Sequence, residues 1–373
     1  MPTYDRYHRQ IILKGFGEAA QQKLLHSKVL VIGAGGLGCP VLQYLAAAGV
    51  GHIGIADDDT VSLSNLQRQP LYSMQHIGQL KVEVARQKLL ELNPDISIEI
   101  FPFRWQPQHC VEYFPAYDLV VDGSDNFATR YMINDACVLL GKPLVFGAVG
   151  QFDGQLGLLN ALQTDGSFSC NYRDLFAEQP AENAVANCAQ AGVLGVLPAV
   201  IGSMMATEVI KWITGIGILP MNKVIVYQAL SQEIFSISLQ KNTTAAALIP
   251  ASIENFLAME YAWACEEPGA KFAISIPAFY ELLDSMEVAV IDVRNYDETP
   301  VIDGFADRRI PLSLLENHLA ELDAEALVFV CQTGVRSLAA ASLASKMNPG
   351  KSVYSLQGGM EAYCAQRNLN HHE

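Results

Sequence analysis

The sequence lacks the paired cysteines of a structural zinc site. Its eight cysteines are scattered over 373 residues, and no two of them have the C-x-x-C spacing. Isolated thiols do not complete a tetrahedral zinc site, so we expect no bound zinc. The same scatter argues against a framework of disulfides.

Positive charge and long apolar runs are also scarce. Lys and Arg total 24 against 39 Asp and Glu, a net charge of −15, which argues against binding to nucleic acid or to anionic membranes. The best candidate for a membrane span, Val193 to Ala206, is too short and contains Pro198 and Gly202. The first residues lack the apolar segment of a signal peptide. We therefore expect a cytoplasmic protein.

What is present is an alternation of buried strands and helices. Lys28 to Gly33 is expected to be a parallel strand, followed by a glycine loop, a helix from Cys39 to Gly49 and a strand from His52 to Asp57. Such a βαβ unit, with its right-handed crossover, is half of a Rossmann-like fold. Further elements are expected at 81–92, 97–101, 118–122, 129–140 and 143–147, and antiparallel strands within 150–162 and 222–240.

The pattern predicts two α/β domains. Residues 1–245 are expected to form a Rossmann-like, doubly wound mixed sheet, and residues 246–270 a linker with some helical character. Residues 271–373 restart the alternation on a smaller scale, with strands at 288–293, 326–330 and 352–356 and a helix at 337–347. A unit of this size is large enough to form its own core.

The glycine loop predicts a nucleotide site. Gly33, Gly35, Gly36 and Gly38 lie between a strand and a helix, where backbone N–H groups hold phosphate. Asp57 ends the next strand and is placed to accept hydrogen bonds from ribose hydroxyls. These residues alone fit a nicotinamide-dependent oxidoreductase equally well.

Charged residues beyond the loop favour nucleotidyl transfer over hydride transfer. Arg68 follows the second strand, and Lys81 opens the next helix. Cations beside the phosphates stabilise the charge that develops when an α-phosphate is attacked. Asp125 follows another strand end, where a carboxylate is suited to Mg²⁺. Taken singly, Arg68 fits a salt-bridge partner as well, and Asp59 a cap of the following turn.

Several segments of the first domain form one joint pattern. They are Arg6-Tyr-His-Arg9-Gln-Ile-Ile-Leu, the Gly-Ala-Gly-Gly-Leu-Gly loop, the run from Asp57 through Asn65 and Arg68 to Gln69, Lys81, and Asp125-Asn126. Over roughly residues 4–240 this pattern resembles that of the ubiquitin-activating-type adenylyltransferases, in particular the bacterial enzymes of molybdopterin and thiamine biosynthesis.

This resemblance implies roles for individual residues. Asp57, Arg68 and Lys81 would contact ATP, and Asn65 would assist at the phosphates. Asp125 would hold Mg²⁺ and line the approach of the substrate's C-terminus. The resemblance also implies a homodimer, in which Arg9 would reach into the ATP site of the neighbouring subunit; taken singly, Arg9 also fits a surface salt bridge.

Cys188 follows the polar stretch 177–187, which we interpret as a loop over the site. The resembled family has a cysteine at this point of its crossover loop, and in several members it forms a covalent intermediate. A thiolate is a competent nucleophile near neutral pH when its pKa is lowered; the alternative is a structural thiol. Relatives commonly carry two C-x-x-C zinc pairs nearby, whereas here Cys170 and Cys265 stand alone.

Cys331 lies in a second chemical context, between a short buried strand and a helix. Backbone N–H groups after the strand and the helix dipole favour a thiolate or persulfide anion, and Arg336 adds positive charge. With Ile291-Asp-Val-Arg294 before it and Leu356-Gln-Gly-Gly359 after it, residues 271–373 resemble a rhodanese domain, in which Cys331 would carry the persulfide. The segment 304–311 departs from the family's usual pattern; the alternative is a domain kept for interaction alone.

Together these features predict a fused adenylyltransferase and sulfurtransferase. The expected substrate is a small β-grasp carrier protein ending in Gly-Gly, adenylated by Mg²⁺-ATP and converted to a thiocarboxylate by sulfur from Cys331. An upstream donor such as a cysteine desulfurase would supply the sulfur. The pathway stays open among molybdopterin, thiamine, cysteine and tRNA thiolation. The alternatives are a nicotinamide oxidoreductase and a ubiquitin-like or peptide-adenylating enzyme without sulfur transfer.

Overall fold

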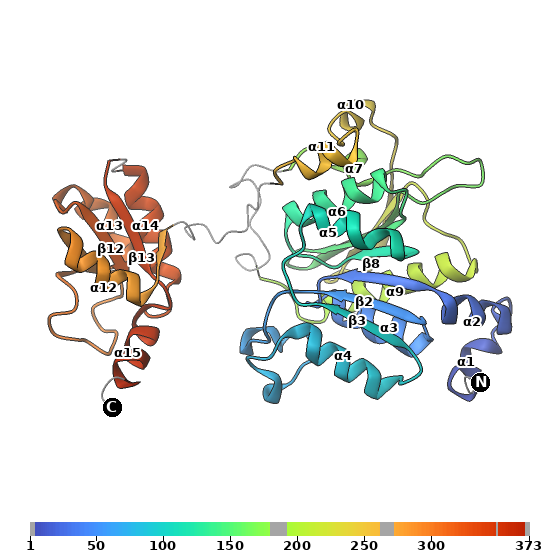
Figure 1. Ribbon diagram of the computed structural model, residues 1–373, viewed down its shortest axis with the longest axis horizontal. Helices are drawn as coiled ribbons and strands as arrows, with labels where there is room; N and C mark the ends of the chain where they lie inside the picture. The colour runs from blue at the N-terminus through green and yellow to red at the C-terminus, as the bar shows by residue number, and fades with distance from the viewer. Residues whose placement is uncertain (1–3, 180–191, 262–271, 348–349, 370–373) are drawn as a thin grey trace. The chain divides into compact units, whose positions relative to one another are not determined.

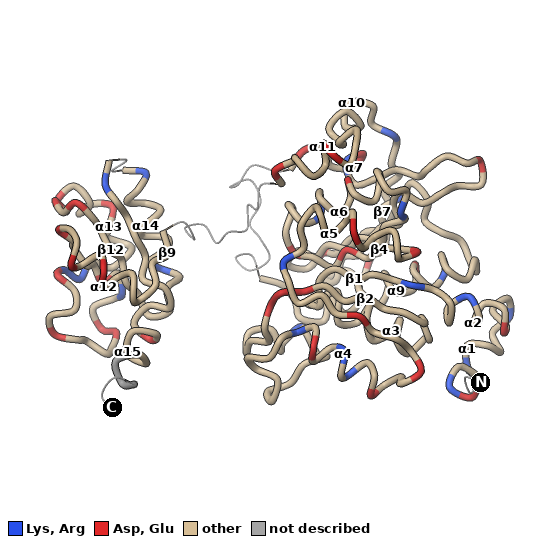
Figure 2. The backbone as a smooth tube through the Cα atoms, viewed as in Figure 1, with Lys and Arg blue, Asp and Glu red and all other residues tan. Residues whose placement is uncertain are grey.

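The computed structural model describes residues 4–179, 192–261, 272–347 and 350–369. The chain divides between residues 263 and 264 into two compact units (Figure 1). Acidic and basic residues are interspersed along both units (Figure 2). Among the helices of the described residues, none is both long and apolar enough to cross a bilayer.

The first unit is built on an eight-stranded mixed sheet. Its first five strands in space run parallel, and the last three continue the sheet antiparallel, as the patterning predicts. In order across the sheet the strands are β3 (Ser97–Phe101), β2 (His52–Ala56), β1 (Lys28–Ile32), β4 (Leu119–Asp122), β5 (Leu144–Val149), β6 (Asp153–Leu159), β7 (Lys223–Gln228) and β8 (Glu233–Ser238).

The register of the central strands determines where the site forms. Ile32 of β1 pairs with Ala56 of β2 on one side and with Asp122 of β4 on the other. The carboxyl ends of these three parallel strands therefore meet at one edge of the sheet. The segments that follow them begin at Gly33, Asp57 and Gly123, and ligands of open α/β sheets bind at such an edge.

Helices cover both faces of this sheet. The expected helix at 81–92 is observed at those bounds, whereas the helix expected at 129–140 begins earlier because the Asn126 side chain accepts a hydrogen bond from Thr129 N at 2.8 Å and caps it. The helices described in this unit are α1 (His8–Ile11), α2 (Gly17–His26), α3 (Gly38–Ala48), α4 (Lys81–Leu92), α5 (Pro107–Tyr113), α6 (Phe127–Leu139), α7 (Tyr172–Leu175), α9 (Leu197–Thr214), α10 (Thr243–Ala246) and α11 (Ile253–Leu257).

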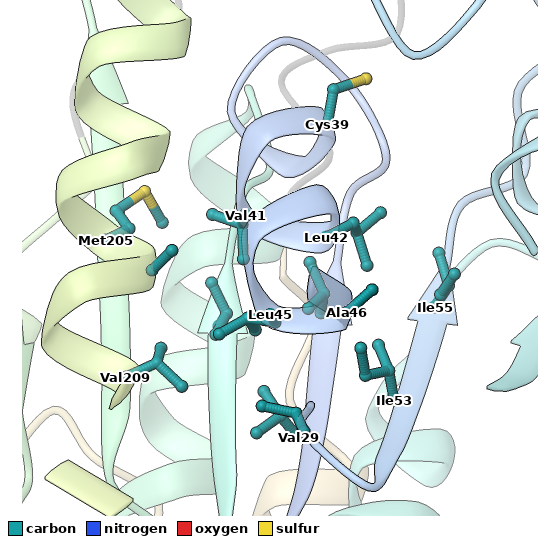
Figure 3. Close-up of a cluster of buried hydrophobic side chains, with 14 of the residues drawn as sticks. Val29, Cys39, Val41, Leu42, Leu45, Ala46, Ile53, Ile55, Met205 and Val209 are labelled. Atoms are coloured by element: carbon teal, nitrogen blue, oxygen red, sulfur yellow. The ribbon is translucent and has the colours of Figure 1, made fainter. Parts of the chain in front are cut away.

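The core on one face joins α3 to α9. Met205 and Val209 of α9 lie beside Val41 and Leu45 of α3 (Figure 3), and all four are fully buried. Gly202 permits this close approach, because a Cβ there would lie 2.4 Å from Pro40 Cγ. From Leu197 on, the apolar stretch that sequence patterning excludes as a membrane span therefore belongs to a helix packed in the core.

The core on the other face includes the end of the unit. Phe256 of α11 and Tyr261 are buried in the same cluster as Tyr131 of α6 and Tyr172 of α7. Part of the segment expected as a linker thus packs on the first unit; the predicted boundaries at 245 and 270 stay a prediction.

The second unit is a five-stranded parallel sheet with helices on both faces. The strands in order are β11 (Arg308–Arg309), β10 (Val288–Asp292), β12 (Ala326–Val330), β13 (Ser352–Leu356) and β9 (Ala273–Ile274). Sequence patterning predicts the three central strands; the two edge strands have two residues each, too few to show a period. The helices are α12 (Ile276–Ser285), α13 (Leu312–His318), α14 (Val335–Met347) and α15 (Gly359–Leu369).

Candidate functional sites

The glycine loop after β1 is held against the backbone of a neighbouring loop. Gly33 has a φ of +94°, and a Cβ there would lie 2.7 Å from Gly123 O. A Cβ at Gly38 would lie 1.9 Å from Gly33 O. No side chain fits at either position, which is the physical reason for two of the four expected glycines. A Cβ at Gly35 would meet nothing closer than 3.7 Å, so that glycine leaves room beside the loop instead.

Asp57 ties the glycine loop to the end of β2. Its carboxylate accepts hydrogen bonds from Ala34 N at 2.8 Å and from Asp59 N at 2.9 Å. Burial raises the pKa of Asp57 above its usual 3.8, against the opposing effects of Lys81 and of these two N–H donors. The side chain expected at the ribose therefore also orders the loop.

Lys81 lies at the centre of the carboxylates. Its side chain is only 5% exposed, and its Nζ lies 2.7 Å from Oδ2 of Asp59, which is 69% exposed. Burial lowers the pKa of Lys81, but Asp57, Asp59 and Asp125 raise it by more, so the net shift is upward. The structure thus brings three predicted site residues, Asp57, Asp59 and Asp125, within electrostatic reach of the protonated amine of a fourth, Lys81.

Carboxylate oxygens for a metal ion are available at the same edge. Asp57, Asp58 and Asp59 each offer an oxygen within 4.8 Å of the others, a trio that sequence reasoning did not single out and that does not include Asp125. Asp125 itself is exposed just before α6 and is within electrostatic reach of Lys81. Hard oxygen ligands of this kind suit Mg²⁺.

Gln69 supplies an independent sign of a ligand. It is 3% exposed, and its Oε1 has no hydrogen-bond partner within the described residues. Its Nε2 is the nearest atom, at 3.7 Å, to a Cβ placed on Gly35, so Gln69 lies next to the glycine loop. A buried acceptor without a donor is rare in folded proteins. The residues present therefore fit a polar ligand that lies along the glycine loop, as a nucleotide would.

Asn65 and Arg68 shape the segment that leads to Gln69. Asn65 belongs to the short helix η2 (Leu63–Asn65), and its Oδ1 accepts from Ser62 N at 3.1 Å. Arg68 is half-buried and donates through Nη1 to Ser64 O at 3.0 Å. Arg9 is exposed on α1, and the described part of the chain holds no partner for its side chain.

A buried ion pair behind the site was not predicted. Arg130 of α6 donates from Nε to Asp122 Oδ2 at 3.0 Å and from Nη2 to Ser124 O and Gly147 O, each at 2.9 Å. Ser124 N also donates to Asp122. The charge of Asp122 raises the pKa of Arg130 although burial opposes it. This network fixes the strand end that presents Asp125. The polar run from Asp122 to Asn126 was the sequence feature from which this network could have been anticipated.

A second group of buried polar contacts, also not predicted from the sequence, centres on Arg173 of α7 and Asp135 of α6. Arg173 stands three residues after Cys170, where a C-x-x-C pair would have its second cysteine. It forms two 2.7 Å bonds to the buried Asp135, which also accepts from Tyr261 Oη at 2.9 Å. Cys170 is buried. Cys188 and Cys265, both singled out from the sequence, lie outside the described residues.

The second site surrounds the Cys331 sulfur in the other unit. Cys331 follows β12 directly and is 1% exposed, and Gly334 N donates to its Sγ at 3.2 Å. The thiol donates to Ser337 Oγ at 3.5 Å; that oxygen also accepts from Ser355 Oγ at 2.8 Å, and its own hydrogen goes to Gly334 O. The loop thus holds one sulfur atom between an amide and a pair of buried hydroxyls.

Arg336, expected to face the sulfur, is paired with an acid that sequence reasoning missed. Its two terminal nitrogens bond the two carboxylate oxygens of Glu298, each at 2.6 Å. Hydrogen bonds from Arg336 and from Asn295 N lower the pKa of Glu298 from 4.5 to about 2. The Arg336 guanidinium is nevertheless within electrostatic reach of Cys331.

Comparisons with known proteins match both units. The ThiF family matches residues 7–247, and the rhodanese-like domain matches residues 275–366. The chain is 40% identical over 367 residues to a probable adenylyltransferase/sulfurtransferase MoeZ of Mycobacterium tuberculosis, covering 97% of this chain and 93% of the relative. It is 35% identical over 382 residues to the adenylyltransferase and sulfurtransferase MOCS3 of Drosophila virilis, covering 97% and 83%.

Two other matches concern the first unit. A sulfur carrier protein adenylyltransferase of Thermus thermophilus is 49% identical over 238 residues, covering 64% of this chain and 88% of the relative. The crystal structure of E. coli MccB with ATP has a TM-score of 0.56 at 24% identity, covering 64% of this chain and 73% of that one. At that identity the second likeness shows the fold alone.

Proposed function

Because the chain belongs to the ThiF family and is an adenylyltransferase and sulfurtransferase, we propose that it activates and thiolates a small β-grasp sulfur carrier protein with a C-terminal Gly-Gly. An adenylyltransferase activity implies the use of ATP, so the nicotinamide alternative is set aside. Support for the carrier comes from the Thermus relative, whose name states that activity.

The observation that carries the adenylation proposal is the buried cation at the glycine loop. Lys81 is held protonated by carboxylates at the edge where β1, β2 and β4 end. Gln69, next to Gly35 of the glycine loop, offers an Oε1 that has no hydrogen-bond partner among the described residues. In the proposed step the carrier's terminal carboxylate attacks the α-phosphate of ATP, and pyrophosphate leaves with the bonding electrons. Lys81 and Arg68 would stabilise the charge that develops. Asp125 would hold Mg²⁺, which would neutralise phosphate charge, and the exposed Asp58 and Asp59 offer further oxygen ligands at the same edge.

The sulfur step is assigned to Cys331. A persulfide on its Sγ would attack the acyl carbon of the adenylate, and AMP would leave with the electron pair of the broken C–O bond. A second thiol must then break the resulting acyl disulfide to release the thiocarboxylate, and we assign this step to Cys188. The Cys331–Cys188 disulfide left behind would be reduced by an external thiol. A donor such as a cysteine desulfurase would supply the persulfide sulfur.

We also propose that the enzyme acts as a homodimer. All six residues of the edge strand β8 are exposed, among them Ile234, Phe235 and Ile237. A long apolar edge strand is normally covered by another surface, and a second copy of this chain is our proposed occupant. Arg9 would then serve the neighbouring ATP site. Arg9→Ala is expected to assemble normally in sedimentation while losing carrier-dependent pyrophosphate exchange; a loss of the dimer would contradict this division of roles.

The adenylation proposal is tested with Asp125→Ala. Carrier-dependent exchange of labelled pyrophosphate into ATP should be lost, whereas the exposed acid Glu83, changed to Ala on α4, serves as the control and should leave the exchange intact. Normal exchange in Asp125→Ala would remove that residue from the mechanism.

The sulfur step has its own test. Cys331→Ala should leave the exchange unchanged and stop thiocarboxylate formation on a Gly-Gly carrier, measured by mass spectrometry. Cys364→Ala on α15 is the matched control. Thiocarboxylate formed at the normal rate by Cys331→Ala would show that an external donor acts alone.

A further inference from the structure

The positive charge of Arg336, at the end of the Cys331 loop, is paired with the carboxylate of Glu298. Both terminal nitrogens of Arg336 are occupied by the two oxygens of Glu298 at 2.6 Å. A bidentate pair of this kind is the strongest geometry available to a guanidinium and uses the edge that would otherwise bind an anion. The loop therefore presents an ion pair beside the sulfur instead of a positive charge.

Glu298 is fixed in this position by its own segment. Asn295 N donates to Glu298 Oε1 at 2.8 Å, and Arg309 Nη2 donates to Glu298 O at 2.8 Å. Arg294 Nη2 holds Pro300 O at 2.9 Å. The carboxylate is thus preorganised for Arg336, and the pair costs little side-chain entropy compared with an ordinary surface ion pair.

The other arginines around the loop are also matched by acid. Arg294 Nη2 lies 2.7 Å from Asp292 Oδ2, and Arg309 Nε lies 3.8 Å from the same oxygen. Each of these three arginines therefore has a carboxylate within 4 Å. A small dianion that approaches the sulfur meets paired charge and must compete with Glu298 for Arg336.

From this arrangement we propose that Glu298 is a specificity-determining residue that disfavours small dianionic sulfur donors such as thiosulfate and so selects a persulfide as donor. The inference rests on the proposed role of Cys331. With thiosulfate, the Cys331 thiolate attacks the outer sulfur, the S–S bond breaks, and sulfite leaves with the electron pair. With a persulfide R–S–S⁻, the thiolate takes the terminal sulfur and R–S⁻ leaves. Only the first reaction brings a dianion to Arg336.

The test compares two donors in the full-length protein, with cyanide as the acceptor that removes sulfur from Cys331 as thiocyanate. Glu298→Gln keeps the size of the side chain and frees the Arg336 charge. We expect its KM for thiosulfate to fall by about tenfold, more at low salt than at high salt, with little change in kcat. Its kinetics with cysteine persulfide should stay within about twofold of the original protein.

Two further variants make the comparison specific. Asp297→Asn removes the same charge from an exposed neighbour and leaves the Arg336–Glu298 pair intact. Its KM values for thiosulfate and for cysteine persulfide should equal those of the original protein. Glu298→Asp keeps the charge but shortens the side chain and loosens the pair, so its thiosulfate KM should fall, by less than in Glu298→Gln. It also preserves the test if Glu298→Gln fails to fold, because a shorter acid that loosens the pair should lower that KM, never raise it.

The outcomes separate cleanly. Equal thiosulfate KM values in Glu298→Gln and the original protein, or parallel changes with both donors, would overturn the proposal and leave Glu298 as a structural residue. Full sulfur transfer by Cys331→Ala with both donors would instead overturn the role of Cys331 and thus the proposed function beneath it.

Discussion

The two sites of this chain treat charge in opposite ways. The site in the first unit gathers carboxylates around the buried amine of Lys81 and leaves the Gln69 Oε1 without a partner in the described structure. The Cys331 loop in the second unit buries its sulfur, satisfies its hydroxyls and pairs its arginine. The first arrangement leaves an acceptor and an open position at Gly35 that fit a polar ligand. In the second, the Cys331 sulfur and the Arg336 guanidinium already have partners, and Arg309 Nε, 3.8 Å from Asp292, is the buried polar atom that makes no hydrogen bond within the described residues.

The largest effect is expected when the buried ion pair between Asp122 and Arg130, which supports the first site, is disrupted. Asp122→Asn leaves the guanidinium of Arg130 buried without its counter-charge, which should destabilise the first unit by about 3–5 kcal/mol. Denaturant unfolding followed by tyrosine and tryptophan fluorescence measures this. The double variant Asp122→Asn/Arg130→Met should recover part of the loss, and a double variant less stable than Asp122→Asn would contradict the account.

The next effect sharpens the contrast between the sites. Lys81→Met removes the cation at the glycine loop and should lower carrier-dependent pyrophosphate exchange by about 10²–10³-fold. Thiosulfate:cyanide sulfur transfer at Cys331 should stay unchanged, because its residues belong to the other unit. Lys88→Met on the same helix, where Lys88 pairs with Glu91, is the control. Equal losses of exchange in both variants would remove Lys81 from the site.

A smaller effect is expected when the sulfur loop loses its internal hydroxyl. Ser337→Ala leaves the buried Ser355 hydroxyl without its acceptor and should destabilise the second unit by about 1–3 kcal/mol. Ser337→Ala/Ser355→Ala should cost less than the sum of the single changes, since it removes both partners. Strict additivity in thermal unfolding would show that the two hydroxyls do not act as a pair.

The smallest effect concerns acid. The pKa of Glu298 is about 2 in the folded chain against its ordinary 4.5. The stabilisation from its pair with Arg336 is therefore complete above about pH 4.5 and is lost as the pH falls through 2. Partly exposed pairs contribute about 1 kcal/mol or less. The unfolding midpoint of the second unit should fall less steeply over this range in Glu298→Gln; identical slopes would contradict the pairing.

Whether a feature of the sites could be predicted from the sequence depends largely on how far apart its residues lie along the chain. The glycine loop, Lys81 and the Cys331 loop were predicted because short segments encode them beside recognisable strands and helices. The long-range pairs were not: Arg173 and Asp135 are 38 residues apart, as are Arg336 and Glu298, and Tyr261 and Asp135 are 126 apart. Periodicity shows that a helix such as α6 forms, but only tertiary packing decides which distant side chain its charges meet.

The ring of Tyr261 has a practical consequence for anyone who wants the first unit by itself. A gene cut at residue 245 would remove both this ring and Phe256, opening a hole in the core beside α6 and depriving Asp135 of one donor. Large holes of this kind cost several kcal/mol. A gene that extends through residue 261 keeps Phe256 and Tyr261 in the core. An isolated first unit should therefore be expressed with these residues if its stability is to match that of the full chain.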